Sequence, residues 1–127
     1  MLEPGLSAEF AVDVTPRDTA ASLGSGEVEV LGTPRVVALV EEATVRAVAG
    51  ALEPGQTTVG TEVVLRHRRP SVPGAGLIVA ARLDEVDGIR LAFSVTVHED
   101  GVLVADGTIR RAIVDRAAFL SQAEKRD

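Results

Sequence analysis

The sequence predicts a single α+β domain in which one long helix packs against an antiparallel sheet. Three observations lead to this fold class. Apolar residues recur at helical spacing after residue 33, they alternate with polar residues over 57–67, and three further apolar runs are separated by Asp-Gly turns. The chain has 127 residues, 46% of them hydrophobic, which is enough for one core. No Pro/Gly-rich stretch is long enough to be a linker, so we expect one domain over residues 1–127.

The segment before the helix is expected to contain two strands and a loop. An alternating run predicts a strand from Leu6 to Val14, and a short strand is expected around Glu27 to Val30. The residues at 15–26, rich in Gly and Ser toward their end, are predicted to form a mobile loop. Residues 20–30 contain no aromatic side chain, so this part of the chain lacks a bulky group that could fill a neighbouring pocket.

The long helix begins at Thr33. Threonine followed by Pro34 is a strong start signal, because threonine can cap exposed N–H groups and proline at the first helical position has no N–H to satisfy. Capping alone is a sufficient reason for Thr33. A helix N-terminus also concentrates partial positive charge, so the same hydroxyl lies where an acyl carbonyl or an oxyanion would be stabilised.

One face of this helix carries a single charge. Glu41 is the only charged member of the stripe that starts at Val37 and is predicted to face inward. The next members of this stripe, three and four positions apart, are Glu41, Thr44, Val45 and Val48. Glu42, by contrast, has Arg46 four residues further on and is expected to be solvated. A buried carboxylate without partners costs several kcal/mol, so an inward Glu41 predicts hydrogen-bond donors or a polar pocket beside it. The alternative is a slightly rotated helix that leaves this carboxylate exposed at the edge of the stripe.

The strand over residues 57–67 ends in a histidine. A strict period of two places His67 in a mostly apolar row with Val63 and Leu65, and Gly60 in the opposite row. A histidine at a strand end is often a structural residue. Beside a carboxylate, however, an imidazole becomes more basic and is held in one tautomer, which general-base hydrolysis requires. The pattern therefore predicts either a structural histidine or a catalytic pair with the helix carboxylate.

Three apolar runs after the Pro73-Gly74 turn are predicted to form an antiparallel meander. They span Leu77–Val86, Ile89–Glu99 and Val102–Val114. Asp87-Gly88 and Asp100-Gly101 are two-residue turns of the kind that close hairpins. Apolar and polar residues alternate along the middle run, so one face of the sheet is expected to pack and the other to be more polar. The last residues, 121–127, are expected to form a polar tail.

Residues Gly32 to about Phe119 resemble the hot-dog thioesterases, most closely the fluoroacetyl-CoA thioesterase-like branch. The resemblance rests on the run GTPRVVALVEEATVRAVAGALEPGQTTVGTEVVLRHRRPSVPG. Within it, VRA lies in the helix, LEPG at the helix exit and VGT at the start of the strand, and the histidine is followed by a Pro-Gly turn. The combination covers most of the chain and is more specific than any one of its motifs.

This resemblance implies a hot-dog fold, in which a curved antiparallel β-sheet wraps a long central helix, and hydrolysis of a small or medium acyl-CoA thioester. The family's Thr, Glu and His constellation falls on Thr33, Glu41 and His67, and its backbone glycine falls on Gly60, whose N–H would hold the oxyanion. Whether the glutamate or the histidine attacks or accepts the proton stays open. The family also implies a homodimer or larger even oligomer with sites at the subunit interface. We expect no cofactor, and the loop without aromatic residues predicts a substrate range broader than fluoroacetyl-CoA.

Local clusters of arginine stand out because the chain as a whole is acidic. Its formal net charge of −6 argues against nucleic-acid binding, which normally requires a basic surface. Arg66, Arg68 and Arg69 flank the histidine and are candidates for contacts with the phosphates of coenzyme A. Arg110 and Arg111, on the last strand, either meet the same phosphates or solubilise an edge of the sheet, and only the cluster near the histidine is taken as a ligand hypothesis.

Several other functions are made improbable by what the sequence lacks. The chain has no cysteine, which excludes disulfides, a thiolate nucleophile and a Cys-based metal site, and we expect no bound metal. It shows no signal peptide and no apolar run long enough to cross a bilayer, so a soluble cytoplasmic protein without membrane partners is expected.

Two alternative functions share the predicted fold. The first is a non-catalytic hot-dog protein that binds an acyl-CoA or a related ligand without turnover. The second is a hydratase or dehydratase, but those enzymes usually show an Asp-x-x-x-x-His motif that this chain lacks. Release of free thiol from a panel of acyl-CoAs would separate hydrolysis from binding alone.

Overall fold

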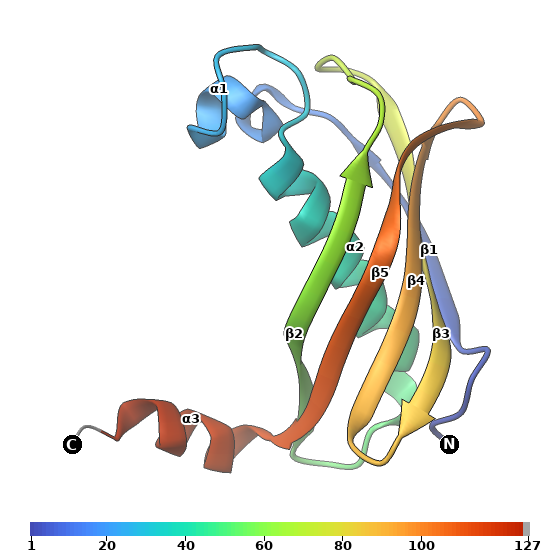
Figure 1. Ribbon diagram of the computed structural model, residues 1–127, viewed down its shortest axis with the longest axis vertical. Helices are drawn as coiled ribbons and strands as arrows, with labels where there is room; N and C mark the ends of the chain where they lie inside the picture. Colours follow the sequence, from blue (N-terminus) through green and yellow to red (C-terminus); the bar gives the residue numbers. More distant parts are fainter. Residues whose placement is uncertain (126–127) are drawn as a thin grey trace.

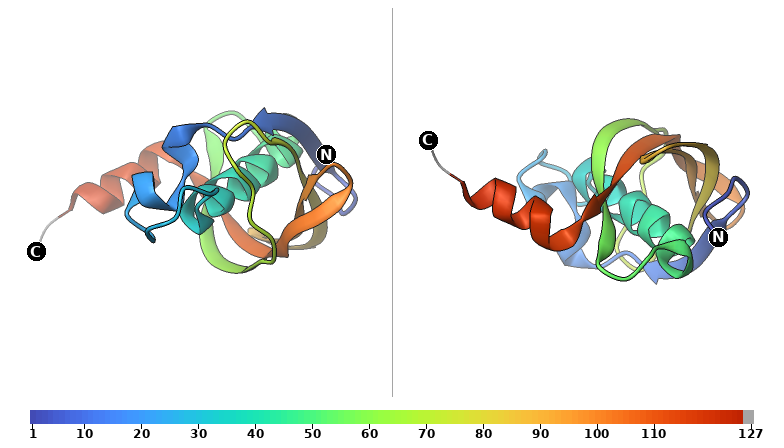
Figure 2. Two further views of the ribbon diagram at one scale, coloured as in Figure 1. Left: turned by 90° about the horizontal axis from the view of Figure 1, so that it is seen from above. Right: turned by 90° about the horizontal axis from the view of Figure 1, so that it is seen from below.

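The computed structural model describes residues 1–125 and shows a long helix wrapped by a five-stranded sheet (Figure 1). The strands are β1 (Ser7–Asp13), β2 (Gln56–His67), β3 (Gly76–Asp87), β4 (Arg90–Glu99) and β5 (Val102–Asp115). They are antiparallel in the order β1-β3-β4-β5-β2. Seen from either end, the sheet curves around helix α2 (Thr33–Val48) (Figure 2). The predicted α+β architecture is therefore confirmed.

The meander predicted for the C-terminal half is present as β3, β4 and β5. Asp100 and Gly101 form the turn between β4 and β5, with φ angles of 49° and 77°, as the hairpin signal predicted. The other turn is shifted by one residue, because Asp87 pairs with Arg90. This order leaves β1 and β2 as the two edges of the sheet.

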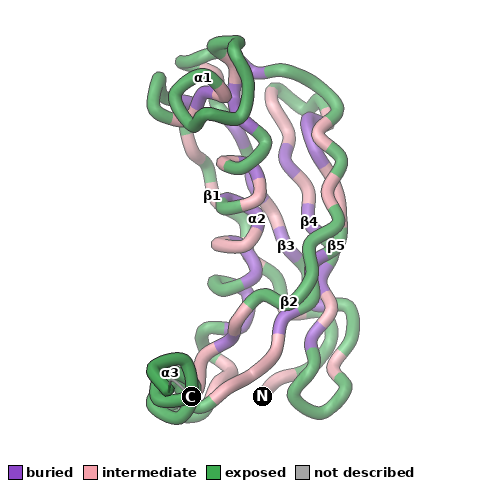
Figure 3. Tube along the Cα trace, turned by 60° about the vertical axis from the view of Figure 1, so that its left-hand side comes forward, coloured by how far each residue is buried: buried purple, intermediate pink, exposed green. Residues whose placement is uncertain are grey.

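The buried face of α2 differs from the predicted stripe. The buried part of α2 lies on the side of the helix that faces the sheet (Figure 3). Its buried members are Val36, Leu39, Val40, Ala43, Thr44, Ala47 and Val48. Val45, which the prediction placed inward, is 43% exposed. The predicted stripe was therefore out of phase, and Glu41 lies at the border of the buried face with its side chain 34% exposed. Glu42 and Arg46 form the predicted solvated ion pair.

A β-bulge interrupts the alternation of β2. Gly60 pairs with Arg111 and Glu62 with Arg110, so Thr61 is the additional residue on β2. A bulge shifts the phase of alternation by one residue. As a result Gly60 faces Glu41 of α2, and His67 also faces α2. The prediction that Gly60 and His67 lie in opposite rows was wrong, because a strict period of two cannot anticipate a bulge.

The segment between β1 and α2 contains short helices where a loop was predicted. It contains a 3-10 turn (Pro16–Asp18) and helix α1 (Ala20–Leu23), whose first turn is capped by Thr19 accepting a hydrogen bond from Ser22 N–H. The short strand expected around Glu27 to Val30 is absent, and these residues form bends followed by an isolated bridge at Leu31. Whether residues 15–26 are mobile stays a prediction.

The last element is helix α3 (Arg116–Glu124), which begins where Asp115 accepts a hydrogen bond from Ala118 N–H. It projects from the end of β5 away from the sheet (Figures 1 and 2). The polar tail predicted for residues 121–127 is therefore helical up to Glu124, and residues 126–127 lie outside the described part. Within residues 1–125, no helix is both long and apolar enough to cross a membrane. The cytoplasmic location stays a prediction.

Candidate active site

The first half of the site is a threonine–histidine pair at the N-terminus of α2. Gly32 is the N-cap and Thr33 is the first helical residue, so the capping role predicted for Thr33 was wrong. Its hydroxyl lies 2.9 Å from Nδ1 of His67, at the end of β2. Backbone hydrogen bonds of α2 and β2 fix the two residues, which are 34 positions apart in the chain. The pair thus holds the imidazole in one orientation at a helix N-terminus, where partial positive charge is concentrated.

The other ring nitrogen of His67 is free for chemistry. Nε2 is buried and has no hydrogen-bond partner of normal geometry among the described residues. Burial lowers the pKa of His67 below its ordinary value of 6.5, and a weaker interaction with the backbone of Arg69 acts in the opposite direction. A neutral imidazole whose Nδ1 donates to Thr33 would leave the Nε2 lone pair available as a general base.

The lowered pKa predicts the acid limb of the activity profile. Because only the neutral imidazole can accept a proton, kcat/KM is expected to fall with decreasing pH at a midpoint below 6.5. The check is a pH profile of kcat/KM at constant ionic strength. The residual activity of His67→Ala should not show this fall of kcat/KM at low pH. A midpoint at or above the ordinary value would contradict the buried, neutral histidine.

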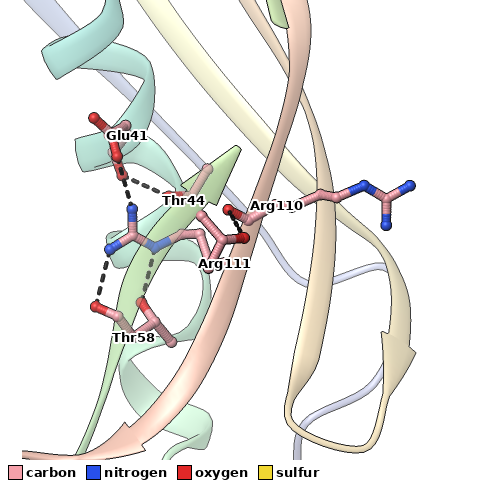
Figure 4. A network of polar contacts seen from close by, with 6 residues as sticks. Glu41, Thr44, Thr58, Arg110 and Arg111 are labelled. Carbon is pink, nitrogen blue, oxygen red and sulfur yellow. Dashed lines mark hydrogen bonds and ion pairs between the residues drawn. The ribbon is translucent and has the colours of Figure 1, made fainter. Parts of the chain in front are cut away.

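The second half of the site is a buried arginine that holds Glu41 (Figure 4). Arg111, on β5, is 7% exposed, and its Nη1–H donates to Glu41 Oε2 over 3.1 Å. Its Nε–H and Nη2–H donate to the hydroxyl and the carbonyl of Thr58, each over 2.9 Å. Burial lowers the pKa of Arg111, and the charge of Glu41 and its hydrogen bond act in the opposite direction. Glu41 thus has the hydrogen-bond donor that an inward carboxylate required.

Arg111 is a residue of the site that the sequence did not predict. It was expected to meet a phosphate or to solubilise a sheet edge, but β5 lies inside the sheet and this side chain points toward α2. A signal was present, because Ile109 and Ile113 occupy the same alternating row. A charged residue in an apolar row is buried only with partners, and the partners come from other elements. Arg110, on the opposite face, is exposed and pairs with Glu62, as a solubilising residue would.

The two halves do not meet within one copy of the chain. No hydrogen bond or ion pair among the described residues joins Glu41 to His67, so the predicted pair is not formed within the monomer. Glu41 lies eight residues after Thr33, which is about 12 Å along a helix. His67 lies six strand steps beyond Gly60 once the bulge is subtracted, which is about 20 Å along a strand.

Gly60 lies against the carboxylate of Glu41. A Cβ atom at this position would come 2.5 Å from Glu41 Oε2 and 3.3 Å from Arg111 Nη1. The absence of a side chain therefore lets the ion pair approach the backbone of β2. The resemblance implied an oxyanion role for the N–H of Gly60, and that role stays a proposal.

Gly60→Ala is expected to lower kcat/KM by at least about tenfold, because the added methyl group displaces the Glu41 carboxylate, and small displacements in a site are costly to rate. The melting temperature should change little, since the displaced atoms are the end of a flexible side chain. Gly50→Ala is the matched control, because a Cβ at Gly50 meets nothing within 4 Å in the described part of the chain. Unchanged kinetics of Gly60→Ala would show that the position of this carboxylate does not matter.

A cavity of about 350 Å³ opens beside the threonine–histidine pair. It is lined by Ala20, Ser25, Gly26, Glu27, Val28, Val30, Leu31, Gly32, Thr33, His67, Arg68, Arg69 and Pro70. Of the three arginines proposed to contact coenzyme A, Arg68 and Arg69 line this cavity and Arg66 does not. Asp106 holds Arg68 through an ion pair of 2.8 Å.

Comparison with known proteins identifies the class to which this fold and site belong. The solved structure of a Thermus thermophilus protein, described as a thioesterase superfamily member, superposes with a TM-score of 0.88 at 28% identity. The superposition covers 95% of this chain and 90% of that one. The helix within its curved five-stranded sheet is thus the hot-dog fold of the thioesterases.

The particular family follows from closer matches. Residues 14–117 match the family described as FlK, fluoroacetyl-CoA-specific thioesterase. The fluoroacetyl-CoA thioesterase of Streptantibioticus cattleyicolor is 35% identical over 98 residues, which are 77% of this chain and 70% of that protein. A solved structure of the fluoroacetyl-CoA thioesterase FlK superposes with a TM-score of 0.92 at 31% identity, over 100% of this chain and 98% of that one. The chain belongs to the FlK family of thioesterases.

Proposed function

We propose that this protein hydrolyses acyl-CoA thioesters of small or medium acyl groups. The observation that carries the proposal is the pair of Thr33 and His67 with a free, buried Nε2 at a cavity that two arginines line. In this arrangement His67 provides a base, the N-terminus of α2 provides a position for a carbonyl, and the arginines provide cations for the phosphates of coenzyme A. Membership of the FlK family makes a thioester the substrate that fits these groups.

In the proposed mechanism, water attacks the thioester carbonyl and His67 Nε2 accepts the proton. The C–S bond then breaks, the thiolate of coenzyme A leaves and is protonated, and a free acid remains. Thr33 holds the imidazole or donates to the substrate, and Gly60 N–H binds the oxyanion. Glu41, held in place by the buried Arg111, acts as a second base in this course. In the alternative course Glu41 attacks the carbonyl in place of water, the thiolate leaves, and water then hydrolyses the resulting anhydride.

We further propose that the active form is a homodimer whose sites combine groups of both copies. β2 is an edge strand of twelve residues, and Val63 and Val64 in its second half are 36% and 53% exposed. An exposed edge with apolar side chains favours pairing with a second strand. Two β2 strands that pair antiparallel about Val63 and Val64 bring Gly60 of one copy roughly opposite His67 of the other. The half-site of Glu41 would then complete the half-site of the partner's His67.

Release of thiol from a panel of acyl-CoAs tests the activity and the substrate range. We expect turnover of acetyl-, butyryl- and hexanoyl-CoA without strong preference for fluoroacetyl-CoA. No residue from 20 to 30 is aromatic, and a missing large apolar side chain forgoes roughly 2 kcal/mol of pocket filling. Binding of acyl-CoA without thiol release would favour the non-catalytic alternative. A strong preference for fluoroacetyl-CoA over acetyl-CoA would show that discrimination comes from other residues.

A further inference from the structure

The cavity beside Thr33 and His67 has one acidic wall and one basic wall. Glu27, in the segment between α1 and α2, lines it from one side, and Arg68 and Arg69 line it from the segment after β2. Among residues 1–125, neither Glu27 nor Arg69 forms an ion pair. These two charges face a shared cavity without neutralising each other.

The backbone around Glu27 is tied in place on both sides. Ser25 N–H donates to Ala20 C=O over 3.0 Å, and Val28 C=O accepts from Ala21 N–H over 3.2 Å. Glu27 therefore sits on a short span between two anchored positions. The other side chains of this wall are small or apolar, so Glu27 is the only charge that it presents within the described lining. Glu29, two residues further on, is exposed and does not line the cavity.

The charges of the two walls set the direction in which a substrate lies. Coenzyme A is a polyanion through its phosphates, so its phosphorylated end is attracted to the arginine wall and repelled by Glu27. The reacting carbonyl must lie at Thr33 and His67. The acyl group continues from that carbonyl away from the sulfur. With the phosphates at the arginines, the charges favour an orientation in which the acyl group lies against the wall that carries Glu27.

We propose that Glu27 selects the charge of the acyl group, and that short acyl-CoAs with a terminal ammonium group are preferred over neutral groups of equal size. A carboxylate-terminated acyl group is disfavoured by the same residue. This inference rests on the proposed thioesterase function and adds a substrate class to it. Glu27 is exposed, and exposed charge pairs contribute modestly, so the expected preference is about fivefold.

The test compares kcat/KM for β-alanyl-CoA, butyryl-CoA and malonyl-CoA, whose acyl groups end in an ammonium, a methyl and a carboxylate group. The wild-type protein should prefer β-alanyl-CoA to butyryl-CoA by about fivefold and should hydrolyse malonyl-CoA more slowly than either. Glu27→Gln should remove the preference, because it keeps the size of the side chain and deletes its charge. Glu29→Gln is the matched control and should keep it.

The outcomes separate this inference from the function on which it rests. If butyryl-CoA is hydrolysed but the ammonium substrate is not preferred, the role of Glu27 is wrong and the thioesterase function stands. An equal loss of the substrate preference in Glu27→Gln and Glu29→Gln would also overturn the inference. It would indicate that the preference comes from the electrostatic field of the whole segment and not from Glu27. If none of the acyl-CoAs, the fluoroacetyl- and hexanoyl-CoA of the wider panel included, releases thiol, the proposed function itself fails.

Discussion

Replacing His67 with alanine is expected to lower kcat/KM for acyl-CoA hydrolysis by about 100-fold or more, the order of effect for loss of an acid–base group. Nε2 of this histidine is buried without a partner among residues 1–125, and Nδ1 is held by Thr33 over 2.9 Å. The variant removes the base but leaves the cavity and its arginines in place. Thiol release under saturating and limiting substrate separates the loss of turnover from any loss of binding.

His98→Ala is the matched control, because His98 is the only other histidine of the chain and does not line the cavity. It should retain wild-type kinetics. Thr33→Val should lower the rate less than His67→Ala does, since it removes the group that orients the ring but keeps the ring. If the His67→Ala variant is folded, as judged by its melting curve, and keeps full activity, the assignment of this residue is wrong.

Mixing two inactive variants is expected to restore activity if the site combines groups of both copies. His67→Ala lacks the proposed base, and Glu41→Gln lacks the carboxylate while its amide oxygen can still accept from Arg111. In a mixed dimer, one site receives Glu41 from the first variant and His67 from the second. Random exchange makes half of the dimers mixed, with one intact site of two, so about a quarter of the wild-type activity should return.

The measurement is thiol release after the variants are unfolded together and refolded, with light scattering to confirm a dimer. Each variant refolded alone should stay inactive. Mixing that restores nothing, although mixed dimers are present, would show that each site is built within one copy. The composite site would then be wrong, and Glu41 would be left as the partner of Arg111 alone.

Part of the fold could be predicted from the sequence because its signals are local. The start of α2 follows from Thr33 and Pro34, and the turn at Asp100 and Gly101 follows from residues that adopt a positive φ readily. The ion pair of Glu42 and Arg46 depends only on helical spacing. Each of these features is decided by residues within one or two turns of the chain.

The geometry of the site was harder to predict from the sequence, because its groups come from distant elements. The bulge at Thr61 brings Gly60 and His67 to the same face of β2, and strict alternation placed them on opposite faces. The buried face of α2 was out of phase by about one residue, which moved Glu41 to its border. The burial of Arg111 could not be predicted, because the sequence does not show that β5 lies inside the sheet.

The sequence by itself determined the elements, the chemistry of the candidate residues and the family resemblance, because periodicity, turn residues and motifs act over short spans of the chain. Only the tertiary structure decided which groups pair. Thr33 holds His67, while Arg111 holds Glu41. These partners lie 34 and 70 positions apart, and packing of the sheet on α2 brings them together. A buried charge takes whichever partner the packed elements place beside it, since leaving it unpaired costs more than a single domain can sustain.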